Sequence, residues 1–102
     1  MSQRDPIRVF VTHVWESGED YQRVFEYLEG TRNFFYRNCS TPDKPPPDLS
    51  VESRREDLRR QINGCEVVIA LSGLLDAHRD LLVFQVNYAK SQEKPVVLLG
   101  GF

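Results

Sequence analysis

The chain has 102 residues and a formal net charge of −2. This length predicts a single domain over residues 1–102 with one core, and the lack of a basic excess argues against nucleic acid as a partner. Its apolar runs are far shorter than the roughly 20 residues of a membrane span, and residues 1–5 lack a signal-peptide pattern, so we expect a cytoplasmic protein without a membrane partner.

The two cysteines do not indicate a disulfide framework or a metal site. Cys39 and Cys65 are too few for a disulfide framework, and neither has a second cysteine or a histidine nearby at the spacing of metal ligands. We therefore expect two buried or half-buried thiols and no metal site.

The first half of the chain predicts a strand, a helix and a second strand. Residues 7–12 form an almost unbroken apolar run and predict a buried strand. Ser17 and Asp20 then have the spacing of a capping box. An apolar stripe with helical spacing runs from Tyr21 to Leu28, and Gly30 ends the predicted helix. Residues 33–38 are aromatic and predict a second strand, at an edge of the sheet.

The second half repeats this alternation. After a proline-rich loop at residues 41–50, a charged segment carries Leu58, Ile62 and Cys65 at helical spacing and predicts a helix that ends at Asn63 and Gly64. Two apolar runs, residues 66–72 and 95–100, then flank a helix near residues 81–91, which is the pattern of a β-α-β crossover.

This alternation predicts an α/β fold with a parallel, flavodoxin-like sheet in strand order 2-1-3-4 and helices on both faces. No GxGxxG follows the first strand, which argues against Rossmann dinucleotide binding. The third strand ends in Ser72 and Gly73 rather than in an aspartate, which argues against a phospho-acceptor. Beyond Phe102 we expect either a missing C-terminal strand or helix, or a partner that covers the open face of the last strand.

Polar and aromatic side chains that follow the predicted strands are the candidate substrate-binding residues, because ligands of parallel sheets bind beyond the carboxyl ends of the strands. They are Thr12, His13, Trp15, Asn38, Ser40 and Ser72. An indole at this edge can stack on a flat ring, and an imidazole can donate to a phosphate. Purely structural roles stay open for each, as strand ends, loop bonds or packing. A hydrolytic pair of His13 with Glu16 or Asp20 is disfavoured because no nucleophile is placed near them.

Five blocks, in this order and spacing, together resemble a TIR-like domain of the bacterial family that includes the signal-making proteins of Thoeris antiphage systems. They are residues 9–15, 35–42, 66–72, 81–89 and 94–97. One departure is Leu81, which stands where the family has a tryptophan.

The resemblance implies an activity. Members cleave the nicotinamide–ribose bond of NAD, which is a substrate rather than a bound cofactor, to make an ADP-ribose-derived immune signal. The partners it implies are an NAD-type or ADP-ribose-type nucleotide, other TIR protomers and, indirectly, a signal-activated effector protein.

Position 85 resembles the catalytic glutamate of NAD-consuming TIR domains, but here it is Gln85. The amide keeps the shape and loses the charge that stabilises an oxocarbenium-like species, so we expect nucleotide binding with little turnover. Two interpretations stay open: an engineered substitution of a catalytic glutamate, or a natural, catalytically silent module that binds nucleotide or assembles. A nucleoside-deoxyribosyltransferase-like enzyme is a third alternative.

Overall fold

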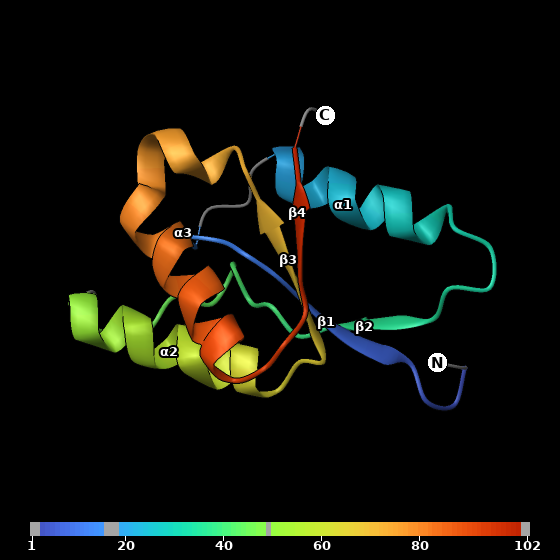
Figure 1. Ribbon diagram of the computed structural model, residues 1–102, viewed down its shortest axis with the longest axis horizontal. Helices are drawn as coiled ribbons and strands as arrows, with labels where there is room; N and C mark the ends of the chain where they lie inside the picture. The colour runs from blue at the N-terminus through green and yellow to red at the C-terminus, as the bar shows by residue number, and fades with distance from the viewer. Residues whose placement is uncertain (1–2, 16–18, 49, 101–102) are drawn as a thin grey trace.

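The computed structural model describes residues 3–15, 19–48 and 50–100 and has an α/β fold (Figure 1). The elements in chain order are β1 (Ile7–Val11), α1 (Glu19–Glu29), β2 (Tyr36–Asn38), α2 (Val51–Asn63), β3 (Val67–Leu71), α3 (Leu74–Ser91) and β4 (Val96–Leu99). Strand and helix alternate as the sequence predicts.

The four strands form one sheet in the order β2-β1-β3-β4, and every neighbouring pair is parallel. The register aligns Val9 of β1 with Asn38 on one side and Val67 on the other. The predicted flavodoxin-like order 2-1-3-4 is therefore confirmed, with β2 at an edge.

Each face of the sheet has its own apolar core. Helix α1 lies on one side of the sheet, and α2 and α3 lie on the other (Figure 1). Successive side chains of a strand point to opposite faces, so Val9 and Val11 of β1 pack in the α1 core while Phe10 packs in the α2–α3 core. Because both faces are covered, β1 and β3 show no polar alternation in sequence.

Two boundaries differ from the sequence prediction by more than one residue. Helix α3 begins at Leu74 rather than near residue 81, and its backbone is non-helical at His78, with φ −138° and ψ 45°. The turn before His78 has no apolar stripe, which is why its helical character is hidden in the sequence. Strand β2 begins at Tyr36 rather than Asn33, whose left-handed φ of 60° is incompatible with a strand. Ser17 of the predicted capping box lies outside the described residues.

Among the described residues, none of the helices has the length and apolar character that a membrane crossing demands. The same residues contain no group of three or more histidine, cysteine or acidic side chains placed to hold a metal ion.

Candidate functional site

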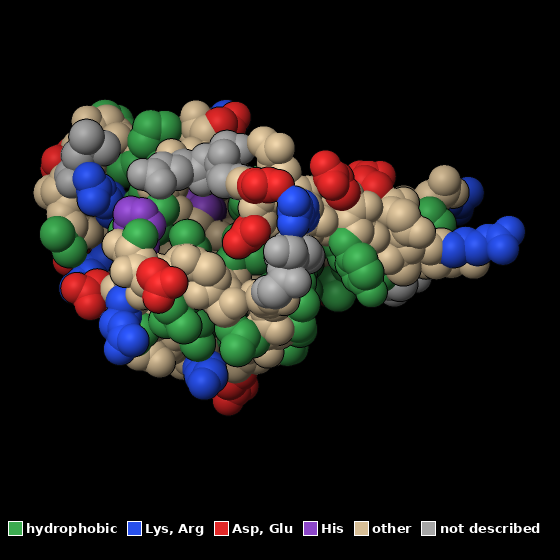
Figure 2. Space-filling model, turned by 90° about the horizontal axis from the view of Figure 1, so that it is seen from above, with side chains coloured by type: hydrophobic (Ala, Val, Ile, Leu, Met, Phe, Trp, Pro, Cys, Tyr) green, Lys and Arg blue, Asp and Glu red, His purple; other side chains and the backbone are tan. Residues whose placement is uncertain are grey.

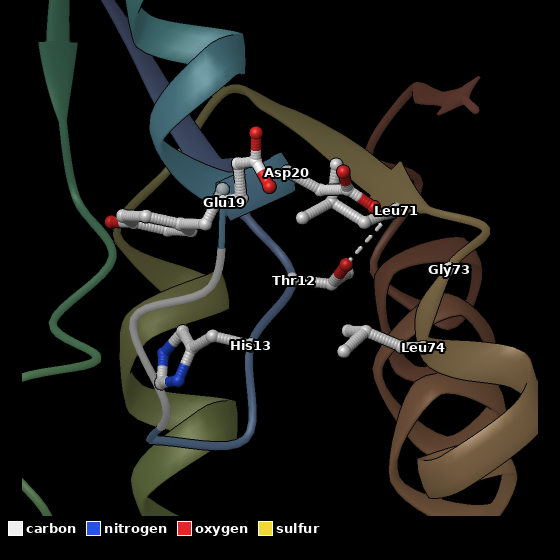
Figure 3. Close-up of a pocket in the computed structure, with 8 residues that line it drawn as sticks. Thr12, His13, Glu19, Asp20, Leu71, Gly73 and Leu74 are labelled. Atoms are coloured by element: carbon white, nitrogen blue, oxygen red, sulfur yellow. Dashed lines mark hydrogen bonds between the residues drawn. The ribbon is translucent and has the colours of Figure 1, made fainter. Parts of the chain in front are cut away.

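A pocket of about 250 Å³ lies at the carboxyl ends of β1 and β3 (Figure 3). Strand order reverses between these two strands, and open parallel sheets bind ligands at this point. We call it the switch-point pocket; its lining residues are Thr12, His13, Glu19, Asp20, Tyr21, Leu71, Gly73 and Leu74. Figure 2 looks down on this end of the molecule and shows several acidic side chains gathered near its middle.

Two carboxylates border the pocket because α1 starts beside it. Glu19 and Asp20 occupy the first turn of α1, where negative charge complements the helix dipole. Glu19 forms an ion pair with Arg23 one turn later. Asp20 points toward the start of α3: a Cβ added to Gly73 would lie 2.7 Å from Asp20 Oδ2. A glycine at position 73 therefore lets the carboxylate approach the α3 backbone closely.

Thr12 forms part of the pocket wall. It is fully buried, its hydroxyl oxygen accepts a hydrogen bond from the Leu71 N–H at 2.9 Å (Figure 3), and its own N–H donates to the Ile69 carbonyl at 2.9 Å. These bonds join β1 to β3 where both strands end. The hydroxyl keeps a proton that it can donate to a ligand.

The imidazole of His13 is turned toward α2. Its Nδ1 accepts a hydrogen bond from the Trp15 N–H at 3.2 Å, so Nε2 carries the proton and donates to Gln61 Oε1 at 2.9 Å. Burial lowers the pKa of His13, although the bond to Gln61 and the charge of Asp57 act in the opposite direction. The ring is therefore held in its neutral form by partners on both nitrogens.

Gln85 is fully buried and bonded to the backbone. Its Oε1 accepts from the His13 N–H at 3.1 Å, and its Nε2 donates to the carbonyls of His13 at 2.9 Å and Leu81 at 3.1 Å. The amide thus ties α3 to the segment after β1 with all its hydrogen-bonding groups in use. It borders His13 but does not itself line the switch-point pocket.

Asn38 and Ser40 form a closed ring of hydrogen bonds with Tyr21. Asn38 Nδ2 donates to Tyr21 Oη at 3.0 Å, the Tyr21 hydroxyl bonds Ser40 Oγ at 2.7 Å, and Ser40 Oγ donates back to Asn38 Oδ1. This ring fixes the end of β2 to α1. Of the three, only Tyr21 lines the pocket.

Neither Ser72 nor Trp15 lines the switch-point pocket. A Cβ on Gly100 would lie 2.1 Å from Ser72 Oγ, so the chain after β4 passes closely over this hydroxyl. Trp15 has a left-handed φ of 61° and packs against the α2–α3 core, and its buried indole N–H has no acceptor among the described residues. The structure therefore brings Thr12 and His13 together in the pocket, whereas Trp15, Asn38, Ser40 and Ser72 are not among the residues that line it.

Sequence reasoning missed the pocket's carboxylates. From sequence, Asp20 is predicted only as part of a capping box and weighed as a partner for His13, and Glu19 is not singled out. Their position in the chain could have indicated them. They lie in the first turn of the helix that follows the first strand, and this turn lies beside the edge of the sheet where ligands bind.

No family model, curated protein or solved structure matches this chain. The functional conclusion therefore rests on the residues and geometry of the chain itself.

Proposed function

We propose that this chain is a TIR-like nucleotide-binding module of bacterial antiviral defence, with the ribose of its ligand in the switch-point pocket. The observation that carries the proposal is the pair of carboxylates, Glu19 and Asp20, beside the Thr12 hydroxyl at the reversal of strand order. Carboxylates at this edge commonly accept hydrogen bonds from ribose hydroxyls. A volume of about 250 Å³ suits a nucleoside-sized part of a ligand.

NAD is the ligand that the charges favour. Its nicotinamide ring is cationic, and the bond to ribose breaks through a species with positive charge on the sugar. A carboxylate beside that position stabilises the cationic ring in the bound ligand and, in the enzyme alternative, the charge that develops on the sugar. Asp20 is the group best placed for this role, because Glu19 is already paired with Arg23. The resemblance of the five sequence blocks to TIR-like domains supports the same ligand.

Gln85 acts in this proposal as a positioning residue. The oxygen and both N–H groups of its neutral amide are already hydrogen-bonded to the His13 and Leu81 backbone. This supports a catalytically silent module over an active NAD-cleaving enzyme. The enzyme remains the second candidate, with Gln85 in place of the glutamate that the family resemblance leads one to expect and self-assembly with other TIR-like protomers as its trigger.

Binding is tested by titrating the ¹⁵N-labelled chain with NAD and following backbone amide shifts. We expect the largest shifts at Thr12, Asp20 and Leu74, and Asp20→Asn should weaken binding about tenfold, as loss of a charge-assisted hydrogen bond does. Glu26→Gln, an exposed change on the same helix, is the control and should leave binding unchanged. Shifts confined to other surfaces would overturn the proposal.

Catalysis is tested with Gln85→Glu by chromatographic measurement of NAD loss, with and without an assembly trigger. NAD loss with this variant but not with the parent chain supports the enzyme. No loss under any trigger, with a variant that thermal unfolding shows to be folded, supports the silent module. Base exchange on deoxynucleosides would instead point to the deoxyribosyltransferase alternative.

A further inference from the structure

A groove of about 660 Å³ lies between α2 and α3 and combines arginines with aromatic rings. It shares no lining residue with the switch-point pocket. Its lining includes Arg55 and Arg59 from α2, and Arg79, Asp80, Val83, Phe84 and Tyr88 from α3. We call it the α2–α3 groove.

Two guanidinium groups lie over one ring in this groove. The Cζ atoms of Arg55 and Arg59 are each 5.3 Å from the centroid of Phe84. The Phe84 ring is in turn stacked on Tyr88, with centroids 6.2 Å apart and planes at 16°. Like charges one helical turn apart repel, and the electron-rich face of the ring offsets part of that repulsion. Positive charge is thus held against a flat apolar wall.

The positive charges of the groove are not equally neutralised. Arg59 forms ion pairs with Glu52 at 3.2 Å and Glu56 at 3.0 Å. Within the part of the chain that the structure describes, Arg55 and Arg79 have no carboxylate at ion-pair distance. The lining contains one carboxylate, Asp80. Two guanidinium forks from different helices therefore remain available to an anion.

We propose that the α2–α3 groove is a second ligand site, which binds a nucleotide through its phosphates. A guanidinium binds phosphate through two parallel hydrogen bonds, and Arg55 and Arg79 can approach one diphosphate from opposite helices. Tyr88 and the half-exposed Val83, beside the Phe84 ring that the arginines cover, offer an apolar surface to the flat base. The volume is in the range of small-molecule sites, which favours a free nucleotide over a phosphorylated peptide.

This site does not depend on the proposed function, because no residue is shared between the two pockets. It also differs in charge: the switch-point pocket has a carboxylate lining that suits hydroxyls and cations, whereas the α2–α3 groove has an excess of arginine. A phosphate therefore favours the groove.

The test uses ADP as the ligand. Adenosine and inorganic phosphate, which represent its base-and-sugar part and its phosphate part, are the comparison ligands. Titration of the ¹⁵N-labelled chain with ADP should shift the side-chain N–H signals of Arg55 and Arg79 and the Phe84 amide, and each comparison ligand alone should bind more weakly. Arg55→Gln and Arg79→Gln should each weaken ADP binding about tenfold, the loss of one charge-assisted contact.

Arg54→Gln is the matched control. It removes the same charge one residue away on α2, at a position that does not line the groove, and should leave ADP binding nearly unchanged. Thermal unfolding checks that the variants fold. If Arg55→Gln does not fold, ADP binding by Arg79→Gln, a substitution at an exposed position, is sufficient to test the site.

Three outcomes would overturn the site: ADP shifts confined to the switch-point pocket, equal weakening by Arg54→Gln and Arg55→Gln, or tighter binding of a phosphotyrosine peptide than of ADP. Asp20→Asn separates this site from the proposed function. If only the proposed function fails, Asp20→Asn leaves NAD binding intact while the arginine variants still weaken ADP binding.

Discussion

The amide of Gln85 is matched to its surroundings in a way that an acid is not. It accepts one bond from the His13 N–H and donates two, to the His13 and Leu81 carbonyls. A carboxylate keeps the accepted bond but faces two carbonyl oxygens without a proton to offer. The residue that best suits this buried position is therefore neutral and able to donate.

Gln85→Glu should consequently destabilise the fold. Leaving buried acceptors unpaired beside a charge costs about 3 kcal/mol, and the unfavourable surroundings raise the pKa of the new carboxyl. A raised folded-state pKa means that the relative loss is greatest above that pKa and shrinks as the pH falls toward about 4.3, the unfolded value. Urea unfolding near pH 7 and near pH 5 measures both parts.

Asn87→Asp is the matched control for this change, because it makes the same amide-to-acid substitution at an exposed position of α3. It should cost less than about 0.5 kcal/mol. A loss for Gln85→Glu that equals the control, or that does not vary with pH, would contradict a stabilising role for the Gln85 bonds to the His13 and Leu81 backbone.

His13 predicts a separate pH dependence. Burial lowers its pKa below the ordinary 6.5, so the unfolded chain takes up a proton at a pH where the folded chain does not. The stabilising contribution is fully present above 6.5 and is lost as the pH falls from 6.5 toward the lowered folded pKa. NMR titration of the His13 ring and unfolding curves between about pH 5 and 8 measure it.

His13→Gln should flatten this part of the stability profile, whereas His78→Gln, on the kinked turn of α3, should leave it in place. An NMR pKa for His13 at or above the ordinary value would show that the neutral, buried ring is the wrong description.

Strand-end position was enough to place Thr12 and His13 at the pocket from sequence. It was not enough for Gln85, because helical spacing tells which face a residue occupies but not which backbone groups its amide meets. The same limit holds for Asn38 and Ser40, whose bonds to Tyr21 depend on a contact between β2 and α1 that no local pattern contains.

At the scale of elements, α2 has the clearest start. Ser50 has an extended backbone, with φ −62° and ψ 157°, and its hydroxyl oxygen accepts a hydrogen bond from the Ser53 N–H at 3.2 Å. This satisfies one of the N–H groups that a helix leaves unpaired. The sequence predicts a helix after the proline-rich loop but does not predict this side-chain cap.

Ser50→Ala removes this cap and should lower the free energy of unfolding by about 1 kcal/mol. Chemical denaturation of the full chain measures the change. Ser53→Ala is the control on the same helix, since Ser53 contributes its backbone N–H and not its side chain to the cap, and alanine has the higher helix propensity. If both substitutions cost the same, the cap carries no stability.

Helix α3 illustrates how element boundaries escape sequence patterns. The non-helical His78 divides it into a short first turn and a longer helix, and only the longer part has an apolar stripe. The first turn matters for the site, because Gly73 and Leu74 line the switch-point pocket. Part of the pocket was thus assigned to a loop in the sequence prediction.

At the scale of the whole molecule, topology was the most predictable feature. Strand and helix alternate, right-handed crossovers and short connections restrict the possible orders, and the strand order 2-1-3-4 follows. The pocket lining was less predictable, because it depends on how α1 and α3 start relative to the strand ends. Those side-chain positions are set by packing in three dimensions and not by spacing along the chain.

The sheet also has an apolar edge that predicts association. In β4, Val96 packs on the α2–α3 core and Leu99 on the α1 core, whereas Val97 is 46% and Leu98 68% exposed. In the described part of the chain β4 pairs only with β3. An apolar edge strand with unpaired backbone groups tends to pair with another chain. We therefore expect self-association that grows with protein concentration.

Leu98→Lys should reduce this association, because a lysine on an edge strand opposes pairing, and should change the free energy of unfolding by less than about 0.5 kcal/mol. Sedimentation velocity over a concentration series measures the first effect and urea unfolding the second. Tyr27→Lys is the matched control, since Tyr27 is 70% exposed on α1, away from this edge. Equal effects of the two lysines would assign the change in association to the net charge, which each substitution shifts from −2 to about −1, and not to β4.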